Sequence, residues 1–171
     1  MTATLTLQIT SKGRDGDVLV IRNGDRPIGA MQLWRNGAVV TWQGHAYEIE
    51  THNVWKHSWV LDEDRREVGR ATERPLSHHH HEWDVTAAES TPAAELVSGW
   101  TPGGMEIHEE GNAVGVVEPE PRSDRFLARL PVGLPESVAV LLIFVGVAAE
   151  RGHLPPTIHR PHQPDRLLIT A

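Results

Sequence analysis

The chain has 171 residues and a mass of 19.0 kDa, which is the size of one ordinary domain. Its hydrophobic fraction of 39% and charged fraction of 23% mark neither disorder nor a membrane protein. The absence of cysteine excludes disulfides, thiolate metal sites and a cysteine nucleophile, and it favours a reducing, cytoplasmic location. The formal net charge of −7 argues against a nucleic-acid partner held by bulk charge.

The charge is distributed unevenly along the chain. Residues 1–76 hold ten basic and ten acidic side chains, whereas 82–124 holds ten acidic side chains and one base, Arg122. This composition predicts one acidic face or end of the fold. Protonation of all eleven histidines would change the formal charge from −7 to +4, so surface behaviour should change near the histidine titration range.

From its first residues the chain reads as short strands joined by tight turns. Residues 1–10 alternate like a strand and lack the basic and apolar regions of a secretion signal. Turn signals such as Asn23-Gly24 and Gln43-Gly44 separate the following apolar runs. We count about twelve strands. They recur about every ten residues with tight connections, a spacing typical of an antiparallel barrel or sandwich. They are predicted near 3–9, 17–22, 27–33, 37–42, 45–51, 57–62, 66–73, 82–88, 94–100, 104–109, 113–118 and 124–130.

A nine-residue pattern occurs three times among these strands. Each copy has an apolar residue, a polar turn, a β-branched residue seven positions later, and then a glycine. We interpret the copies as repeated hairpins in which the glycine faces backbone or a helix that passes close by. The copies are IRNGDRPIG at 21–29, LDEDRREVG at 61–69 and IHEEGNAVG at 107–115.

The character of the sequence changes near residue 133. Thirteen residues without a charge, 137–149, predict a helix over about 135–150. They are fewer than the ~20 residues that a bilayer span needs, so no transmembrane segment is expected. Apolar residues occupy every face of this helix, so it must be enclosed, and its length suits the axis of a closed barrel. The predicted barrel therefore spans 1–152.

The last residues, 153–171, form a separate segment rich in proline. It holds four prolines, which favour an extended and poorly hydrogen-bonded backbone. Residues 166–170 are a candidate edge strand within this tail.

The three hairpin copies, ending in Ile28-Gly29, Val68-Gly69 and Val114-Gly115, together with the apolar helix over 138–149 resemble the tubby C-terminal-like superfamily. This group includes tubby-like domains, phospholipid scramblases and LURP-one-related proteins. The resemblance implies a twelve-stranded barrel closed around one hydrophobic helix. It also implies binding rather than catalysis, because tubby-like members are associated with phosphoinositides and scramblases with membrane lipids.

We expect a non-enzymatic binding or scaffold protein without a cofactor, whose partner is a small molecule, a lipid or a protein. The densest cluster of aromatic and polar residues, and hence the first candidate pocket, contains Trp55, Lys56, His57 and Trp59. A second candidate is an anion patch of Arg66, Arg70 and Arg74, which share one parity of a predicted strand. The acidic composition weakens the expectation of an anionic membrane partner.

The alternative is a metal-dependent, cupin-like enzyme. Four consecutive histidines allow an H-x-H pair such as His78 and His80 (or His79 and His81), and His108 follows downstream. Imidazole runs bind divalent metals when two or three rings converge. The match with the cupin motifs is imperfect, because the glycine-to-histidine spacing before His108 is one residue too long and the expected glutamate is displaced.

Overall fold

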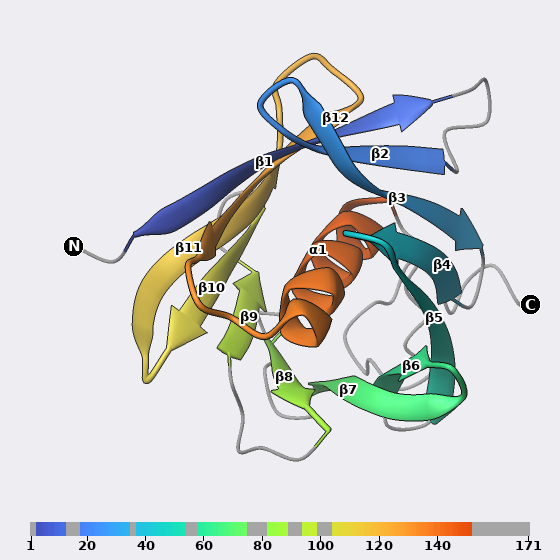
Figure 1. The fold of residues 1–171 in the computed structure, drawn as a ribbon. Helices are drawn as coiled ribbons and strands as arrows, with labels where there is room; N and C mark the ends of the chain where they lie inside the picture. The colour runs from blue at the N-terminus through green and yellow to red at the C-terminus, as the bar shows by residue number, and fades with distance from the viewer. Residues whose placement is uncertain are drawn as a thin grey trace, which may run out of the picture.

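The computed structural model describes residues 3–12, 18–34, 37–53, 58–74, 82–88, 94–98 and 104–151. These residues form a closed antiparallel barrel of twelve strands around one C-terminal helix (Figure 1), as the sequence predicts. The elements are β1 (Thr4–Lys12), β2 (Val18–Asn23), β3 (Arg26–Trp34), β4 (Gly37–Trp42), β5 (His45–Asn53), β6 (Ser58–Glu63), β7 (Arg66–Glu73), β8 (Glu82–Ala87), β9 (Ala94–Ser98), β10 (Met105–Glu109), β11 (Asn112–Pro119), β12 (Arg125–Pro131) and α1 (Glu136–Glu150).

Each strand pairs with its neighbour in sequence, and the first strand closes the barrel against the last. In this closing pair, Leu7 of β1 lies opposite Ala128 of β12, and Ile9 lies opposite Phe126. All four side chains face the interior and are buried. The closure also brings the outward-facing residues of the first and last strands side by side on the outer wall.

Three hairpins contain the same irregularity, a β-bulge one residue before the shared glycine. In β2–β3, β6–β7 and β10–β11 the register shifts just after Ile21, Leu61 and Ile107. An extra residue on the returning strand produces each shift. The extra residues are Ile28, Val68 and Val114, which pack partly buried against the core. The repeated hairpins predicted from the sequence are confirmed, and they recur at every fourth strand around the barrel.

The glycine after each bulge faces a close neighbour, as predicted. A Cβ atom on Gly29 would lie 2.5 Å from the carbonyl oxygen of Thr41. On Gly69 it would lie 2.9 Å from Cδ1 of Leu141 in the helix. Glycine is therefore required where the next strand or the helix approaches.

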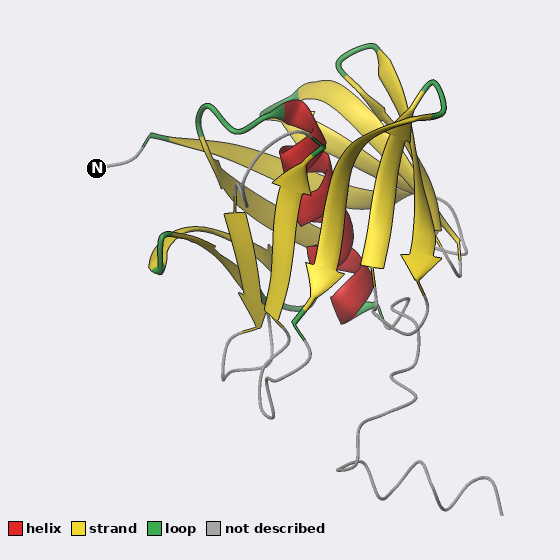
Figure 2. Ribbon diagram, turned by 90° about the horizontal axis from the view of Figure 1, so that it is seen from below, coloured by secondary structure: helices red, strands yellow, loops and turns green. Residues whose placement is uncertain are grey.

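Helix α1 fills the lumen of the barrel (Figure 2). It starts one residue later than the predicted 135 and ends at the predicted 150, and residues 138–148 are all buried. The helix approaches β11 so closely that a Cβ on Gly146 would lie 2.7 Å from Cγ1 of Val117. Among the described residues, no helix combines the length and the apolar character needed to cross a bilayer.

Side chains at both ends of α1 tie it to the wall. In the first turn, the hydroxyl of Tyr47 donates to Oε2 of Glu136 at 3.2 Å. Burial, reinforced by this hydrogen bond, raises the pKa of Tyr47 to about 12. After the last turn, Arg151 donates to Oγ of Ser11, and its guanidinium lies 5.6 Å from the ring centre of Phe126. The helix is thereby tied to β5, β1 and β12.

Three tryptophans line the interior and pack the space between wall and helix. Trp42, Trp59 and Trp83 are no more than 2% exposed. The ring of Trp59 meets that of Phe144 edge to face, with centroids 5.0 Å apart. The indole nitrogen of each has no hydrogen-bond partner within the described structure. Their contribution is therefore the burial of large apolar surface.

The proline-rich segment predicted over 153–171, with its candidate strand at 166–170, lies outside the described residues.

Candidate binding site on the outer wall

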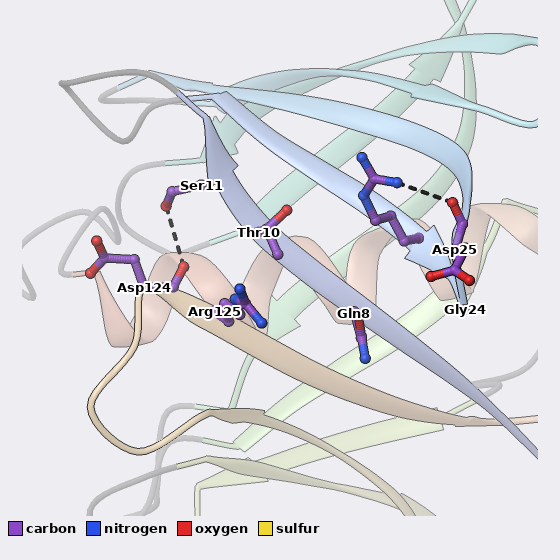
Figure 3. Close-up of a pocket in the computed structure, with 8 residues that line it drawn as sticks. Gln8, Thr10, Ser11, Gly24, Asp25, Asp124 and Arg125 are labelled. Carbon is purple, nitrogen blue, oxygen red and sulfur yellow. Dashed lines mark hydrogen bonds between the residues drawn. The ribbon is translucent and has the colours of Figure 1, made fainter.

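A hollow of about 520 Å³ lies on the outer wall, over β1 and the neighbouring ends of β2 and β12 (Figure 3). Its volume falls within the range of small-molecule sites. Its lining is almost wholly polar or charged. The lining residues are Gln8, Thr10, Ser11, Arg22, Gly24, Asp25, Asp124 and Arg125.

Strand alternation and register bring these residues together. Leu7 and Ile9 point into the core, so Gln8 and Thr10, which alternate with them, point outward and form the floor. In the antiparallel register, Arg22 of β2 lies opposite Gln8, and Arg125 of β12 lies opposite Thr10. The two arginines therefore flank β1 from opposite sides.

A tight turn between β11 and β12 positions one end of the hollow. The N–H of Glu120 donates to the carbonyl of Arg125 at 2.8 Å, and the N–H of Arg125 donates to Oγ of Ser123 at 3.3 Å. Ser11 in turn donates to the carbonyl of Asp124 at 3.4 Å, a bond drawn in Figure 3. These bonds hold the backbone of Asp124 and Arg125 beside the end of β1.

The β2–β3 turn positions the other end. Nη1 of Arg22 donates to the carbonyl oxygen of Asp25 at 3.1 Å, which directs the guanidinium along the turn. Gly24 has a φ of 57°, a left-handed conformation that glycine adopts without strain. Figure 3 places Asp25 and Asp124 at opposite ends of the hollow.

The charges of this hollow are balanced but are not paired with each other. Within the described residues, neither Arg22 nor Arg125 forms an ion pair with a carboxylate, and neither Asp25 nor Asp124 forms one with a base. By contrast, Arg129, further along β12, contacts Glu118 at 2.7 Å. The hollow thus presents two guanidinium and two carboxylate groups whose hydrogen-bonding capacity is largely free for a ligand.

Two of the arginines predicted as an anion patch, Arg70 and Arg74, have carboxylate partners in the structure. The bulge at Val68 shifts the alternation of β7 by one residue, so that Glu67 shares the outer face with Arg70. Arg70 binds Glu67 through two bonds of 3.0 and 2.9 Å, while Arg66 begins the strand. This hydrogen bond lowers the pKa of Glu67 and raises the pKa of Arg70.

Arg74, just after β7, is surrounded by acidic side chains of β8 and β9. Its Nη2 lies 2.7 Å from Asp84 and 2.6 Å from Glu95, and its Nη1 lies 3.5 Å from Glu82. Hydrogen bonds to Asp84 and Glu95 raise the pKa of Arg74 further above its usual range. Anion binding by Arg66, Arg70 and Arg74 stays a prediction, and an anion at Arg70 or Arg74 would compete with these carboxylates.

The predicted aromatic cluster is described only in part. Trp55, Lys56 and His57 lie outside the described residues. Trp59 is the only member of the cluster among the described residues. Its ring is buried and contacts Phe144 in the core. Ligand binding by this cluster stays a prediction.

The histidines of the metal alternative are also described only in part. His78, His79, His80 and His81 lie outside the described residues. Nε2 of His108 lies 3.0 Å from Oε2 of Glu106 on the same strand. Among the residues that the structure describes, no three histidine, aspartate or glutamate side chains gather as a metal site would require.

Sequence reasoning missed the residues of the hollow. Its only local signal is the alternation of polar and apolar residues in β1, which most outer strands share. The hollow depends on the pairing of β1 with β12, in which Ser11 and Asp124 are separated by 113 positions. If the predicted twelve strands are assumed to close into a barrel, the first strand must pair with the last. That assumption would have placed Ser11 near Asp124.

Comparison of the chain with protein-family models, curated proteins and solved structures finds no match.

Proposed function

We propose that this protein is a non-enzymatic binding protein whose ligand occupies the outer-wall hollow of β12, β1 and β2. The observation that carries the proposal is the pair of guanidinium groups, Arg22 and Arg125, which line one hollow without a carboxylate partner among the described residues. Arginine side chains that lack an ion pair are suited to recognise carboxylate or phosphate groups.

Apart from Asp25 and Asp124, the side chains of the lining favour binding over catalysis. Guanidinium groups stay protonated and do not act as general acids or bases near neutral pH. The hydroxyl of Ser11 accepts from Arg151 and donates to a backbone carbonyl, so it is not activated as a nucleophile. The floor residues Gln8 and Thr10 supply hydrogen bonds and no titrating group.

A ligand screen with matched variants tests this proposal. Ligand-observed NMR of a library of small charged molecules is carried out on the wild type and on the double variant Arg22→Gln/Arg125→Gln. The control is Arg65→Gln, which removes one charge from an exposed turn outside the hollow. We expect hits that the double variant loses and the control keeps. Hits that survive in the double variant, or no hits with the wild type, would refute the proposal.

The barrel with its enclosed helix is compatible with membership of the tubby C-terminal-like superfamily, which we propose on the pattern of hairpins and helix. This resemblance is the sole support for a lipid-related ligand. Flotation with liposomes at pH 5 and pH 7.5 tests it, and absence of binding at both values would exclude the lipid. The cytoplasmic location and the metal-dependent alternative stay predictions, the latter decided by metal analysis of untagged protein.

A further inference from the structure

The two ends of the hollow have the same composition of charges. One end presents Arg22 and Asp25, and the other presents Arg125 and Asp124. Within each end the guanidinium and the carboxylate do not pair, although they are at most three residues apart. A simple anion at either end would be attracted by the arginine and repelled by the aspartate, so a purely anionic ligand gains little there.

The floor between the ends is neutral and extended. It follows β1 from Gln8 to Thr10, about 7 Å at a rise of about 3.4 Å per residue, and the flanking strands β2 and β12 lie about 10 Å apart across it. Its amide and hydroxyl groups can donate and accept hydrogen bonds along this length. A ligand that engages both ends must therefore carry its charges about 10 Å apart.

We propose that the hollow binds a short peptide of about three residues, with its terminal carboxylate at one arginine and its terminal ammonium at the aspartate of the opposite end. This inference rests on the proposed function and specifies the ligand class. An extended tripeptide spans about 10 Å, whereas a free amino acid cannot reach both ends. The peptide backbone finds partners in Gln8 and Thr10 of the floor.

The charge of each pole also favours a carboxylate over a phosphate monoester. A carboxylate carries one negative charge and accepts two parallel bonds from a single guanidinium. A phosphate monoester carries about −1.5 to −2 at pH 7, more than one arginine beside an aspartate can balance. Each end of the hollow, with one arginine and one aspartate, therefore suits a ligand group of a single charge, either a carboxylate or an ammonium.

Titration of the labelled full chain with a set of alanine peptides tests the inference by heteronuclear NMR. The probes are Ala-Ala-Ala, its N-acetylated form, its C-terminal amide, and free alanine. We expect Ala-Ala-Ala to shift the amide signals of Gln8, Thr10 and Arg125. Each capped peptide, and alanine, should bind about tenfold more weakly because one pole is lost or out of reach.

Variants assign the poles. Because a peptide can lie in either direction, Arg125→Gln and Asp124→Asn should each weaken binding of Ala-Ala-Ala, and the double variant Arg22→Gln/Arg125→Gln should abolish it. Arg65→Gln should leave it unchanged. Equal affinity for capped and free peptides, or no shifts at millimolar peptide, would overturn the inference. A screening hit of another class that needs Arg22 and Arg125 would still leave the proposed function standing.

Discussion

At the scale of single residues, the glycines of the bulged hairpins show how closely neighbouring backbones pack. A Cβ on Gly115 would lie 2.3 Å from the carbonyl oxygen of Arg129. Gly111, in the turn of the same hairpin, has open space around it but a φ of 79°. The two glycines are required for different reasons, one steric and one conformational.

Substitution by alanine separates these two reasons. Gly115→Ala should lower the free energy of unfolding by about 3 kcal/mol or more, because the rigid backbone of β12 must move. Gly111→Ala should cost only about 1–2 kcal/mol, the strain of a left-handed alanine. Urea denaturation of both variants measures the difference. Equal costs would contradict the close approach of the strands.

The side chain of His45 provides a titrating contact at this scale. Its Nδ1 lies 2.7 Å from Oε1 of Glu63, and this hydrogen bond, followed by the charge of Glu63, raises the pKa of His45. A raised pKa in the folded state means that protonation stabilises the fold. The contribution is complete below the unfolded pKa of about 6.5 and is lost as the pH rises through the folded value.

We therefore expect His45→Gln to destabilise the protein at pH below about 6.5 and to have little effect in alkaline solution. Thermal unfolding of wild type and variant across this range measures the difference. The variant Glu67→Gln serves as a comparison of opposite sign, because Arg70 lowers the pKa of Glu67. Its stabilising contribution is present above the unfolded value and is lost on acidification. A pH-independent effect of His45→Gln would contradict the hydrogen bond.

At the scale of elements, the helix and the wall fit through complementary small and large residues. Gly146 of α1 faces Val117 of β11, which is fully buried. On another side of the helix, Leu141 approaches Gly69 of β7. Over the buried residues 138–148 no face of α1 is polar, so the helix contacts the wall there through apolar groups, and its position depends on steric fit.

A double-mutant cycle tests this fit. Gly146→Ala should cost about 2–3 kcal/mol, because its Cβ would overlap Val117. Val117→Ala alone should cost about 2 kcal/mol through lost burial and a cavity. In the double variant the added methyl occupies the vacated space, so the combined cost should fall short of the sum by about 1 kcal/mol or more. Strict additivity in denaturant unfolding would show that the two residues are not in contact.

At the scale of the whole molecule, closure of the barrel is a non-local event in an otherwise local topology. Eleven of the twelve strand pairings join neighbours in sequence, and only β1 with β12 joins distant segments. Pairing distant segments requires closing a long loop, which costs entropy before the contacts form. The seam between β1 and β12 should therefore form late in folding.

Folding kinetics test the order of these events. Leu7→Ala on β1 and Ile49→Ala on β5 each remove a fully buried side chain and should each cost about 2–5 kcal/mol. Leu7→Ala should mainly accelerate unfolding, whereas Ile49→Ala, which lies within the local β4–β5 hairpin opposite Ala38, should also slow folding. Stopped-flow tryptophan fluorescence distinguishes the two. A slowed folding limb for Leu7→Ala, matching that of Ile49→Ala, would contradict late closure.

The strands, turns and helix follow from the sequence because their signals are local. Alternation as in Leu7, Gln8 and Ile9 defines which face of a strand is buried, and turn residues such as Gln43-Gly44, with φ values of 49° and 93°, define where it reverses. A helix that is apolar on every face must be buried, and the consecutive hairpins that precede it in the sequence can form a wall around it. The barrel and its central helix were therefore predictable.

The candidate site, in contrast, was decided by tertiary structure. Arg22 and Arg125 line one hollow on either side of β1 only because the first and last strands pair, and no local pattern specifies that pairing. Likewise, the bulge at Val68 places Glu67 beside Arg70, where simple alternation had grouped Arg70 with other arginines. Local periodicity is enough to predict that this acidic, cysteine-free chain forms a barrel around a helix. Long-range register decides which charges on the described part of the wall are paired and which are not, because it sets which side chains of neighbouring strands meet.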